Sequence, residues 1–194
     1  MIEVKRYSEN PDKYWSLIEK FRQQTFKEGN QSLSYEKYDP DNNNIETWLS
    51  FQDDKLISIS AAENSHYTND PNIAVRICRY HILKEHRFTH CGLIMGEHQV
   101  KWAREQGYKI LYITHDIKNK AINNLYQRRK QMTDKAFKEH INGEWYTSLQ
   151  VEKKFLFTTG KMLQYVYSIR LQGEYDWQPK SDYIVEREHD GQII

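Results

Sequence analysis

The chain has few cysteines. Cys78 and Cys91 are the two present among its 194 residues, which is too few for the disulfide framework of a small secreted protein. The N-terminal stretch MIEVKRYSEN has neither the apolar core of a secretory signal nor the basic, acid-poor composition of an organellar leader. We therefore expect a reducing, cytoplasmic setting.

The sequence also lacks a long apolar run and an excess of either charge. A transmembrane helix needs roughly 20 apolar residues in succession, and because no segment approaches this we expect no membrane partner. Lys and Arg number 28 against 27 Asp and Glu, so no global field attracts nucleic acid. What is present is 38% hydrophobic and 13% aromatic residues, which is typical of a folded chain.

The first third of the chain predicts a strand, a helix and a hairpin. Apolar and polar residues alternate over residues 2–7, as in a strand. Asn10 and Pro11 then provide a cap and a first-turn proline for a helix ending near Gly29. We expect a buried stripe on this helix from Tyr14, Trp15, Leu17, Ile18 and Phe21. After a long polar loop over 30–44, two β-favouring runs meet at Asp53-Asp54, which predicts a hairpin.

The middle of the chain predicts a strand, a helix and a second strand. The run IAVRICRYHIL over 73–83 favours a central strand, and apolar positions repeat on one helical face from 93 to the stop at Gly107. The run KILYIT follows as a buried strand. This order fits a right-handed crossover between parallel neighbours.

The last third predicts a helix and two closing strands. Residues 118–140 have a helical composition, and the run from Lys153 to Leu171 predicts two strands with a turn or bulge at Gly160. The chain length suits one hydrophobic core. We therefore expect a single domain over 1–172, followed by a polar tail over 173–194.

Two short motifs occur in this layout. Arg87, His90 and Gly92 lie in the turn before the middle helix, and Asn119 and Tyr126 follow the next strand. Residues 83–126 thereby resemble the core of the GNAT acyltransferase superfamily, whose motifs are Gln/Arg-x-x-Gly-x-Gly/Ala and Asn-x-x-Ala-x-x-x-Tyr. The sequence departs from them with His90 at the first glycine and Ile122 at the alanine. The usual Gly-Phe after the tyrosine is also missing, and a polar helical insertion is expected over 127–143.

The resemblance implies an α/β fold with a mixed, mostly antiparallel central sheet and helices on both faces. It also implies an N-acetyltransferase-like enzyme that binds acetyl-CoA or another acyl-CoA and transfers the acyl group to an amine by direct attack. The implied cofactor contacts are Ile82 and Leu83 with the pantetheine, Asn119 and Tyr126 with the thioester end, and Arg87, Phe88, Thr89, His90, Cys91 and Gly92 with the pyrophosphate.

Helix geometry explains how such a turn could hold a pyrophosphate. Backbone N–H groups at a helix N-terminus point outward, and the helix dipole favours negative charge there. Residues from Phe88 to Gly92 could therefore each donate a hydrogen bond, whatever their side chains. His90 is tolerated if its φ is helical, or at modest cost in the left-handed region.

Amine acylation needs a base, a donor for the developing oxyanion and an acid for the leaving thiolate. Tyr126 is the acid that the resemblance implies, and Glu63 and His81 are the candidate bases. Arg76 and Arg79 are unusual on a central strand, and one of them is expected to meet an acidic acceptor or a carboxylate of the protein. Neither the amine acceptor nor the oligomeric state can be read from these patterns.

Other readings compete with this one. The turn could be a plain strand-to-helix connection, or the fold could be a GNAT-like binding module without catalysis for a protein or nucleic-acid partner. Basic residues over 128–138 could contact phosphates, although a solvated helix face is the simpler explanation. A zinc site would need three or four converging ligands, and we expect no metal. The residues that such a site could use are His81, His86, His90, Cys91 and His98.

Overall fold

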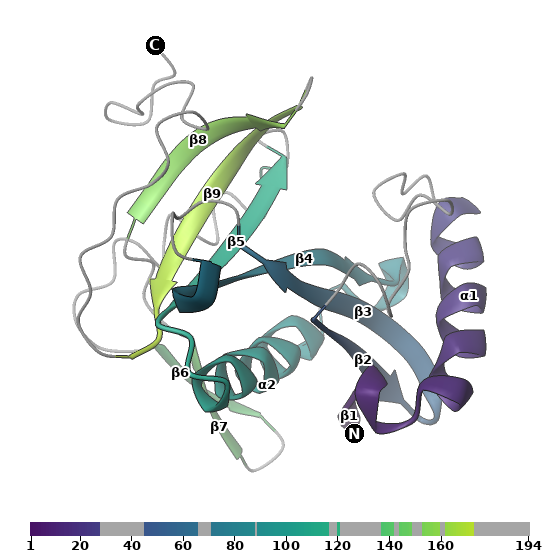
Figure 1. Ribbon diagram of the computed structural model, residues 1–194. Coiled ribbons are helices and arrows are strands. Elements are labelled where there is room, and N and C mark those ends of the chain that lie inside the picture. The colour runs from purple at the N-terminus through teal and green to yellow at the C-terminus, as the bar shows by residue number, and fades with distance from the viewer. Residues whose placement is uncertain are drawn as a thin grey trace. The chain divides into compact units, whose positions relative to one another are not determined.

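The computed structural model describes residues 1–27, 45–65, 71–87, 89–116, 120, 137–141, 144–148, 153–159 and 162–172. The described elements are β1 (Ile2–Arg6), η1 (Tyr7–Glu9), α1 (Pro11–Lys27), β2 (Glu46–Gln52), β3 (Lys55–Asn64), η3 (Pro71–Ile73), β4 (Ala74–Ile82), η4 (Lys84–His86), α2 (Cys91–Glu105), β5 (Ile110–Asp116), β6 (Phe137–Ile141), β7 (Glu144–Ser148), β8 (Lys153–Thr159) and β9 (Met162–Arg170) (Figure 1).

Hydrogen bonds join the strands in the order β1-β2-β3-β4-β5-β9-β8, and β6 and β7 form a separate two-stranded sheet. The pairs β1–β2, β2–β3, β5–β9 and β8–β9 are antiparallel. The predicted mixed, mostly antiparallel sheet is therefore confirmed. β5 is the neighbour of β4, which is the adjacency that the predicted crossover requires.

The chain divides into two compact units. The first takes in residues 1–63, 77–99 and 140–146, and the second takes in 64–76, 100–139 and 147–194. The single domain over 1–172 stays a prediction. The predicted tail over 173–194 and the loop over 30–44 lie outside the described residues.

In the first unit, α1 begins as the sequence predicts. The Asn10 side-chain oxygen accepts a hydrogen bond from the backbone N–H of Lys13 at 3.2 Å, which caps the first turn. Tyr14, Ile18 and Phe21 are buried in the core. Trp15 is 39% exposed, so its predicted place in the buried stripe was wrong. Successive helical residues are 100° apart around the axis, which turns Trp15 away from the face that Ile18 and Phe21 share.

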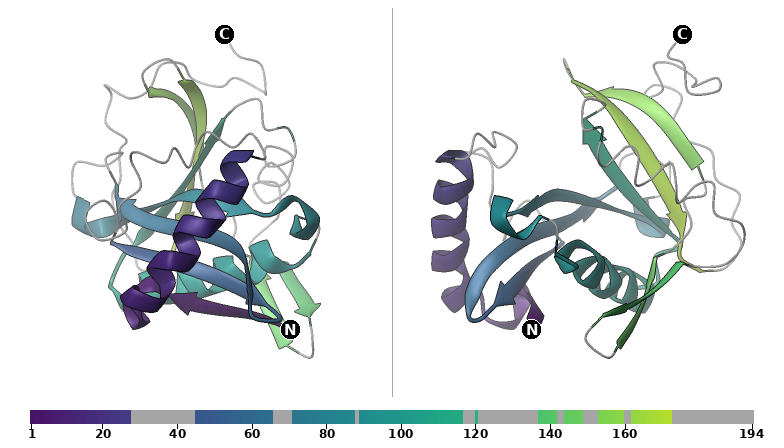
Figure 2. Two further views of the ribbon diagram at one scale, coloured as in Figure 1. Left: turned by 90° about the vertical axis from the view of Figure 1, so that its right-hand side faces the viewer. Right: turned by 180° about the vertical axis from the view of Figure 1, so that it is seen from behind.

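In the first unit, the hairpin of β2 and β3 lies between α1 and the first part of α2. Leu49 and Ile59 belong to the core cluster that α1 covers, whereas the Ser58 hydroxyl lies 3.8 Å from the Met95 sulfur of α2. Residues of opposite parity on β3 therefore face opposite helices. Figures 1 and 2 show α1 and α2 on opposite sides of these strands, as the prediction of helices on both faces requires.

Asp53 and Asp54 form the two-residue turn of this hairpin. Their φ values are 50° and 61°, and positive φ at both central residues is the mark of a type I′ turn. Aspartate tolerates this conformation better than most residues. The predicted hairpin and its turn are confirmed.

In the second unit, α2 ends where the sequence indicates. Gly107 has φ 84°, and the N–H of Tyr108 donates to the Ala103 carbonyl at 3.0 Å, as at helix ends that glycine terminates. The Arg104 side chain then donates to the Leu171 carbonyl at 3.0 Å. The predicted closing strands are confirmed as β8 and β9.

The helical prediction for the late segment was wrong at its end. Residues 137–141 form strand β6, paired with β7. In the sequence, the apolar residues Phe137 and Ile141 are four positions apart, a spacing that fits a helix as well as a strand. The strand is therefore defined by its pairing with β7 rather than by a local pattern. Residues 121–136 lie outside the described part of the chain.

Within the described residues, neither α1 nor α2 has the length and apolar composition that a membrane crossing requires.

Candidate functional site

The connection from β4 to α2 has the local structure that the motif predicts. After η4, the Thr89 hydroxyl donates to the His86 carbonyl at 2.7 Å and accepts from the Cys91 N–H at 3.3 Å. The His90 carbonyl then accepts the N–H groups of Leu93 and Ile94, both at 3.0 Å. The turn thus ends in a capped helix N-terminus, which is a geometry that favours anions.

His90 needs no glycine-like backbone at the first motif position. Among the described residues other than glycine, positive φ occurs at Asp53, Asp54 and Arg79, and His90 is not one of them. Its side chain is exposed. The replacement of glycine by His90 therefore leaves the backbone of the turn unstrained, and the imidazole is directed to solvent rather than into the core.

Two N–H groups of the turn are already engaged. Thr89 donates its N–H to the His86 carbonyl at 3.2 Å, and Cys91 donates to the Thr89 hydroxyl at 3.3 Å. The N–H groups of Thr89 and Cys91 therefore have partners within the protein in this structure, and their role as pyrophosphate donors stays a prediction. Phe88 lies outside the described residues.

Gly92 lies where β4 approaches the first turn of α2. A Cβ on Gly92 would lie 3.1 Å from the Tyr80 hydroxyl oxygen and 3.7 Å from Cδ1 of Ile82. At Gly96, one turn later, the same Cβ would meet nothing within 4 Å. A glycine at position 92 thus lets strand side chains approach the helix N-terminus closely.

The two residues assigned to the pantetheine have backbone partners within the protein. Leu83 donates its N–H to the Ile57 carbonyl at 2.9 Å, and its side chain is fully buried. The Ile82 carbonyl accepts a hydrogen bond from Nε of Arg87 at 3.2 Å. The Leu83 N–H is therefore used within the sheet, while the Ile82 carbonyl is covered by a long, exposed side chain.

The two candidate bases differ in their surroundings. His81 is 7% exposed and packs edge-to-face against Phe21, with 5.8 Å between ring centroids. Glu63 forms an ion pair with Arg79, with side chains 15% and 23% exposed. The expectation that one strand arginine meets a carboxylate of the protein is therefore confirmed. His81 faces the core under α1, whereas Glu63 retains some contact with solvent.

Asn119 and Tyr126, the residues assigned to the thioester end, lie outside the described part of the chain. Their roles stay predictions that rest on the resemblance.

The chemistry of Cys91 does not suit a metal ligand. The residue is fully buried, and burial raises the pKa of its thiol, although the nearby Ser50 and Ser58 side chains lower it in part. A metal binds the thiolate rather than the thiol. Over the residues that can be described, no three His, Cys, Asp or Glu side chains are grouped as a metal ion would need.

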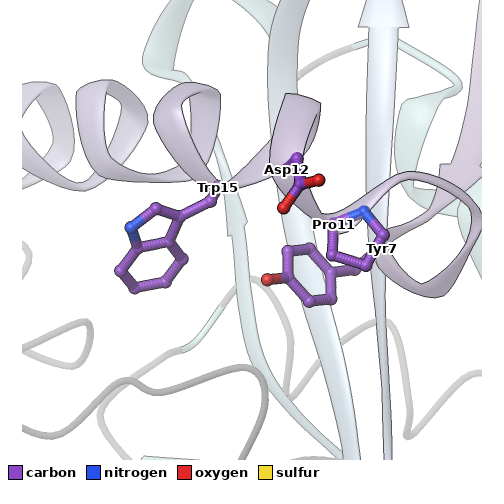
Figure 3. Close-up of a pocket in the computed structure, with 4 residues that line it drawn as sticks. All are labelled: Tyr7, Pro11, Asp12 and Trp15. Carbon is purple, nitrogen blue, oxygen red and sulfur yellow. The ribbon is translucent and has the colours of Figure 1, made fainter.

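A shallow surface pocket of about 310 Å³ lies at the start of α1, lined by Tyr7, Pro11, Asp12 and Trp15. Figure 3 shows the indole of Trp15 and the carboxylate of Asp12 projecting from the first turns of the helix. None of the predicted site residues lines this pocket. The pocket therefore shares no lining residue with the predicted cofactor turn.

Sequence reasoning named Thr89 and Arg79 but did not identify the contacts that these residues and Tyr80 make. Tyr80 contacts the helix N-terminus, Thr89 caps it, and Arg79 binds Glu63. A Thr two residues before a helical pattern is a local signal that could have identified the cap. The other two contacts join positions distant in sequence, and neither has a local signature.

No protein-family model matches the chain, and no curated protein matches its sequence. Solved structures do match its fold. A proposed acyl-CoA N-acyltransferase from Klebsiella pneumoniae shares 13% identity over 89% of this chain and 99% of its own, with a TM-score of 0.54. A proposed GNAT-family acetyltransferase from Desulfovibrio desulfuricans shares 10% identity over 89% and 100% of the two chains, also with a TM-score of 0.54.

A proposed phosphinothricin N-acetyltransferase shares 11% identity over 89% of this chain and 100% of its own, with a TM-score of 0.54. Identities this low establish the fold alone. The chain has a GNAT-like fold.

Proposed function

We propose that this protein is an acyl-CoA-dependent N-acyltransferase, with acetyl-CoA as the most suitable donor and an amine as acceptor. The observation that carries the proposal is the junction of β4 and α2. There the motif residues from Arg87 to Gly92 lead into a capped helix N-terminus within a GNAT-like fold. Fold alone does not establish activity. The motif residues in the turn are therefore a second and separate reason for proposing acyl transfer.

The described residues fit a CoA pyrophosphate in three respects. The N-terminus of α2 favours an anion, Arg87 supplies a cation beside it, and Gly92 keeps the first helical turn open to close approach. For the Ile82 carbonyl to pair with the pantetheine, the Arg87 side chain must leave it. We propose that Arg87 does so by turning toward the pyrophosphate.

When bound, acetyl-CoA supplies the thioester carbonyl that an amine attacks. On the protein side, Glu63 accepts a proton from the ammonium of the acceptor, because it is the candidate base that retains solvent access. Tyr126 donates its hydroxyl proton to the leaving sulfur. His81 is the weaker candidate base because it is buried against Phe21.

The proposal is tested by mixing the protein with acetyl-CoA and, separately, glucosamine, lysine, spermidine or an alanine-initiated peptide, and detecting the acetylated amine by mass spectrometry. We expect one class of amine to be acetylated. Tyr126→Phe should reduce turnover while leaving the affinity for acetyl-CoA unchanged, and unchanged turnover would remove Tyr126 as the acid.

A specific observation favours a second function, a GNAT-fold binding module without catalysis. Three backbone donors of the cofactor region, those of Leu83, Thr89 and Cys91, already have partners in the protein. A protein that folds but binds neither acetyl-CoA nor CoA would support this alternative. The same result would mean that the protein has no acetyl donor, so an acetylation assay could not reveal its function.

A further inference from the structure

Glu63 and Arg79 come together from neighbouring strands. Glu63 lies near the end of β3 and Arg79 in the second half of β4, and their side chains form an ion pair. Both side chains are largely buried, with 15% of Glu63 and 23% of Arg79 exposed. Water screens such a pair less than a surface pair, so each charge depends more strongly on the other.

The backbone of Arg79 is strained. Its φ is 51°, a left-handed conformation that is unfavourable for a residue other than glycine. Among the described residues it is the one with positive φ inside a strand. Such strain persists when the surroundings fix it, and it concentrates at functional sites.

Three consecutive side chains of β4 have different partners. Tyr80 reaches the first turn of α2, and His81 packs on Phe21 of α1. Arg79 binds Glu63 of the neighbouring strand β3.

Further contacts hold the guanidinium in place. Nη1 of Arg79 lies 3.6 Å from the Cys78 sulfur, which in turn lies 3.6 Å from the Ala61 carbonyl. The Ser60 hydroxyl donates to the Cys78 carbonyl at 3.3 Å. These contacts join the part of β4 around Arg79 to β3 near Glu63. The ion pair therefore lies where side-chain contacts also connect the two strands.

We propose that Arg79 is a positioning residue for Glu63, holding its carboxylate in place as the base of the proposed acyl transfer. The base role rests on the proposed function, whereas the coupling of the two residues does not. A carboxylate has about four lone-pair sites, so an ion pair does not by itself prevent it from accepting a proton. In that step an N–H bond of the acceptor ammonium breaks and an O–H bond forms on Glu63, while the electron pair remains on nitrogen.

The coupling is tested in the protein alone. We would measure urea unfolding of the wild type, Arg79→Met, Glu63→Gln and the double variant. We expect each single variant to lower the unfolding midpoint and the double variant to lower it by less than their sum, because each single change leaves one largely buried charge without its partner. Additive effects would overturn the coupling.

The positioning role is tested by chemical rescue. Arg79→Gly removes the side chain, and glycine accepts the positive φ without strain. With acetyl-CoA and the most reactive of the four amines named above, we expect kcat to fall at least tenfold while acetyl-CoA affinity is kept. Millimolar guanidinium should restore much of kcat. Glu63→Gln should show a similar loss without rescue.

A matched control is Arg76→Gly with guanidinium, because Arg76 lies on the same strand. Rescue of Arg79→Gly but not of Glu63→Gln or Arg76→Gly supports the positioning role, whereas kcat unaffected by Arg79→Gly overturns it. A wild type that binds acetyl-CoA but acetylates no amine overturns the base role. In that case the urea unfolding of the four proteins still tests the coupling between Arg79 and Glu63. A wild type without acetyl-CoA binding overturns the proposed function itself.

Discussion

The hydroxyl oxygen of Tyr80 on β4 lies 3.1 Å from the point that a Cβ on Gly92 would occupy in the first turn of α2. This distance is shorter than most contacts that a Cβ makes, so a side chain at position 92 would require the Tyr80 ring to move. The missing side chain of Gly92 therefore leaves the space that the Tyr80 hydroxyl of the preceding strand occupies. This contact defines the part of the protein where we expect the CoA pyrophosphate to bind.

A double-mutant cycle measures that contact. Alanine is favoured over glycine in a helix by roughly 0.5 to 1 kcal/mol. In a Tyr80→Phe background, Gly92→Ala should therefore stabilise the fold by about this amount, since the obstructing oxygen is gone. In the wild-type background we expect a smaller gain or a loss. Urea unfolding of the four proteins tests this, and an equal gain in both backgrounds would contradict the close approach.

The contact between Ser8 and Glu46 predicts a stability effect near the N-terminus. The Glu46 carboxylate is 7% exposed and accepts from the Ser8 hydroxyl at 2.6 Å and its N–H at 3.3 Å. Ser8→Ala should cost about 1.5 to 3 kcal/mol of unfolding free energy, the range for hydrogen bonds to charged groups. Ser16→Ala is the control, because the Ser16 hydroxyl makes an exposed bond of 3.4 Å within α1. Equal effects of the two substitutions would contradict this prediction.

The turn of the β2–β3 hairpin offers a stabilising substitution. Asp54 has φ 61°, and glycine adopts this conformation without the penalty that a Cβ brings. Asp54→Gly should raise the unfolding free energy by about 1 kcal/mol, as measured by thermal denaturation. Asp54→Val should lower it, because a β-branched residue is least suited to positive φ. A lower Tm for Asp54→Gly than for the wild type would show that the aspartate side chain contributes more than its backbone conformation costs.

The buried thiol of Cys91 predicts a loss of stability at high pH. Burial raises the pKa of this thiol in the folded state, so above about pH 8.5, the ordinary thiol value, the unfolded chain loses a proton that the folded chain keeps. The unfolded state then binds fewer protons, and stability falls as pH rises.

Cys91→Ala removes this titration while Cys78 and Tyr108 remain in both proteins. The stability advantage of the wild type over Cys91→Ala should therefore shrink between pH 8.5 and pH 10, by up to about 1.4 kcal/mol per pH unit. Urea unfolding under reducing conditions measures it. A difference that stays constant over this range would place the thiol in a more polar environment than its burial indicates.

Features encoded by neighbouring residues could be predicted from the sequence. Asn10 and Pro11 determine the start of α1, and Gly107 determines the end of α2, because caps and stops depend on a few adjacent side chains. The Asp53-Asp54 turn is likewise local. The resemblance of residues 83–126 to the GNAT core then implied the GNAT-like fold.

Features that depend on tertiary contacts could not be predicted. No local pattern indicates that Arg79 adopts positive φ or that its side chain meets Glu63, since the pair joins two strands. The burial of His81 on Phe21 likewise depends on how α1 packs on the sheet. Strand β6 was missed because its five residues have no period-two alternation and follow a run with helical composition.

The most direct test of the central claim is calorimetric titration of acetyl-CoA and CoA into the wild type, Gly92→Glu and Gly96→Glu. Both variants add one negative charge to α2, but position 92 lies at the cofactor turn and position 96 one turn further along, with open space around it. We expect the wild type and Gly96→Glu to bind and Gly92→Glu, still folded, to lose binding. Absence of binding by the folded wild type, or equal binding by both variants, would contradict a CoA site at this helix N-terminus.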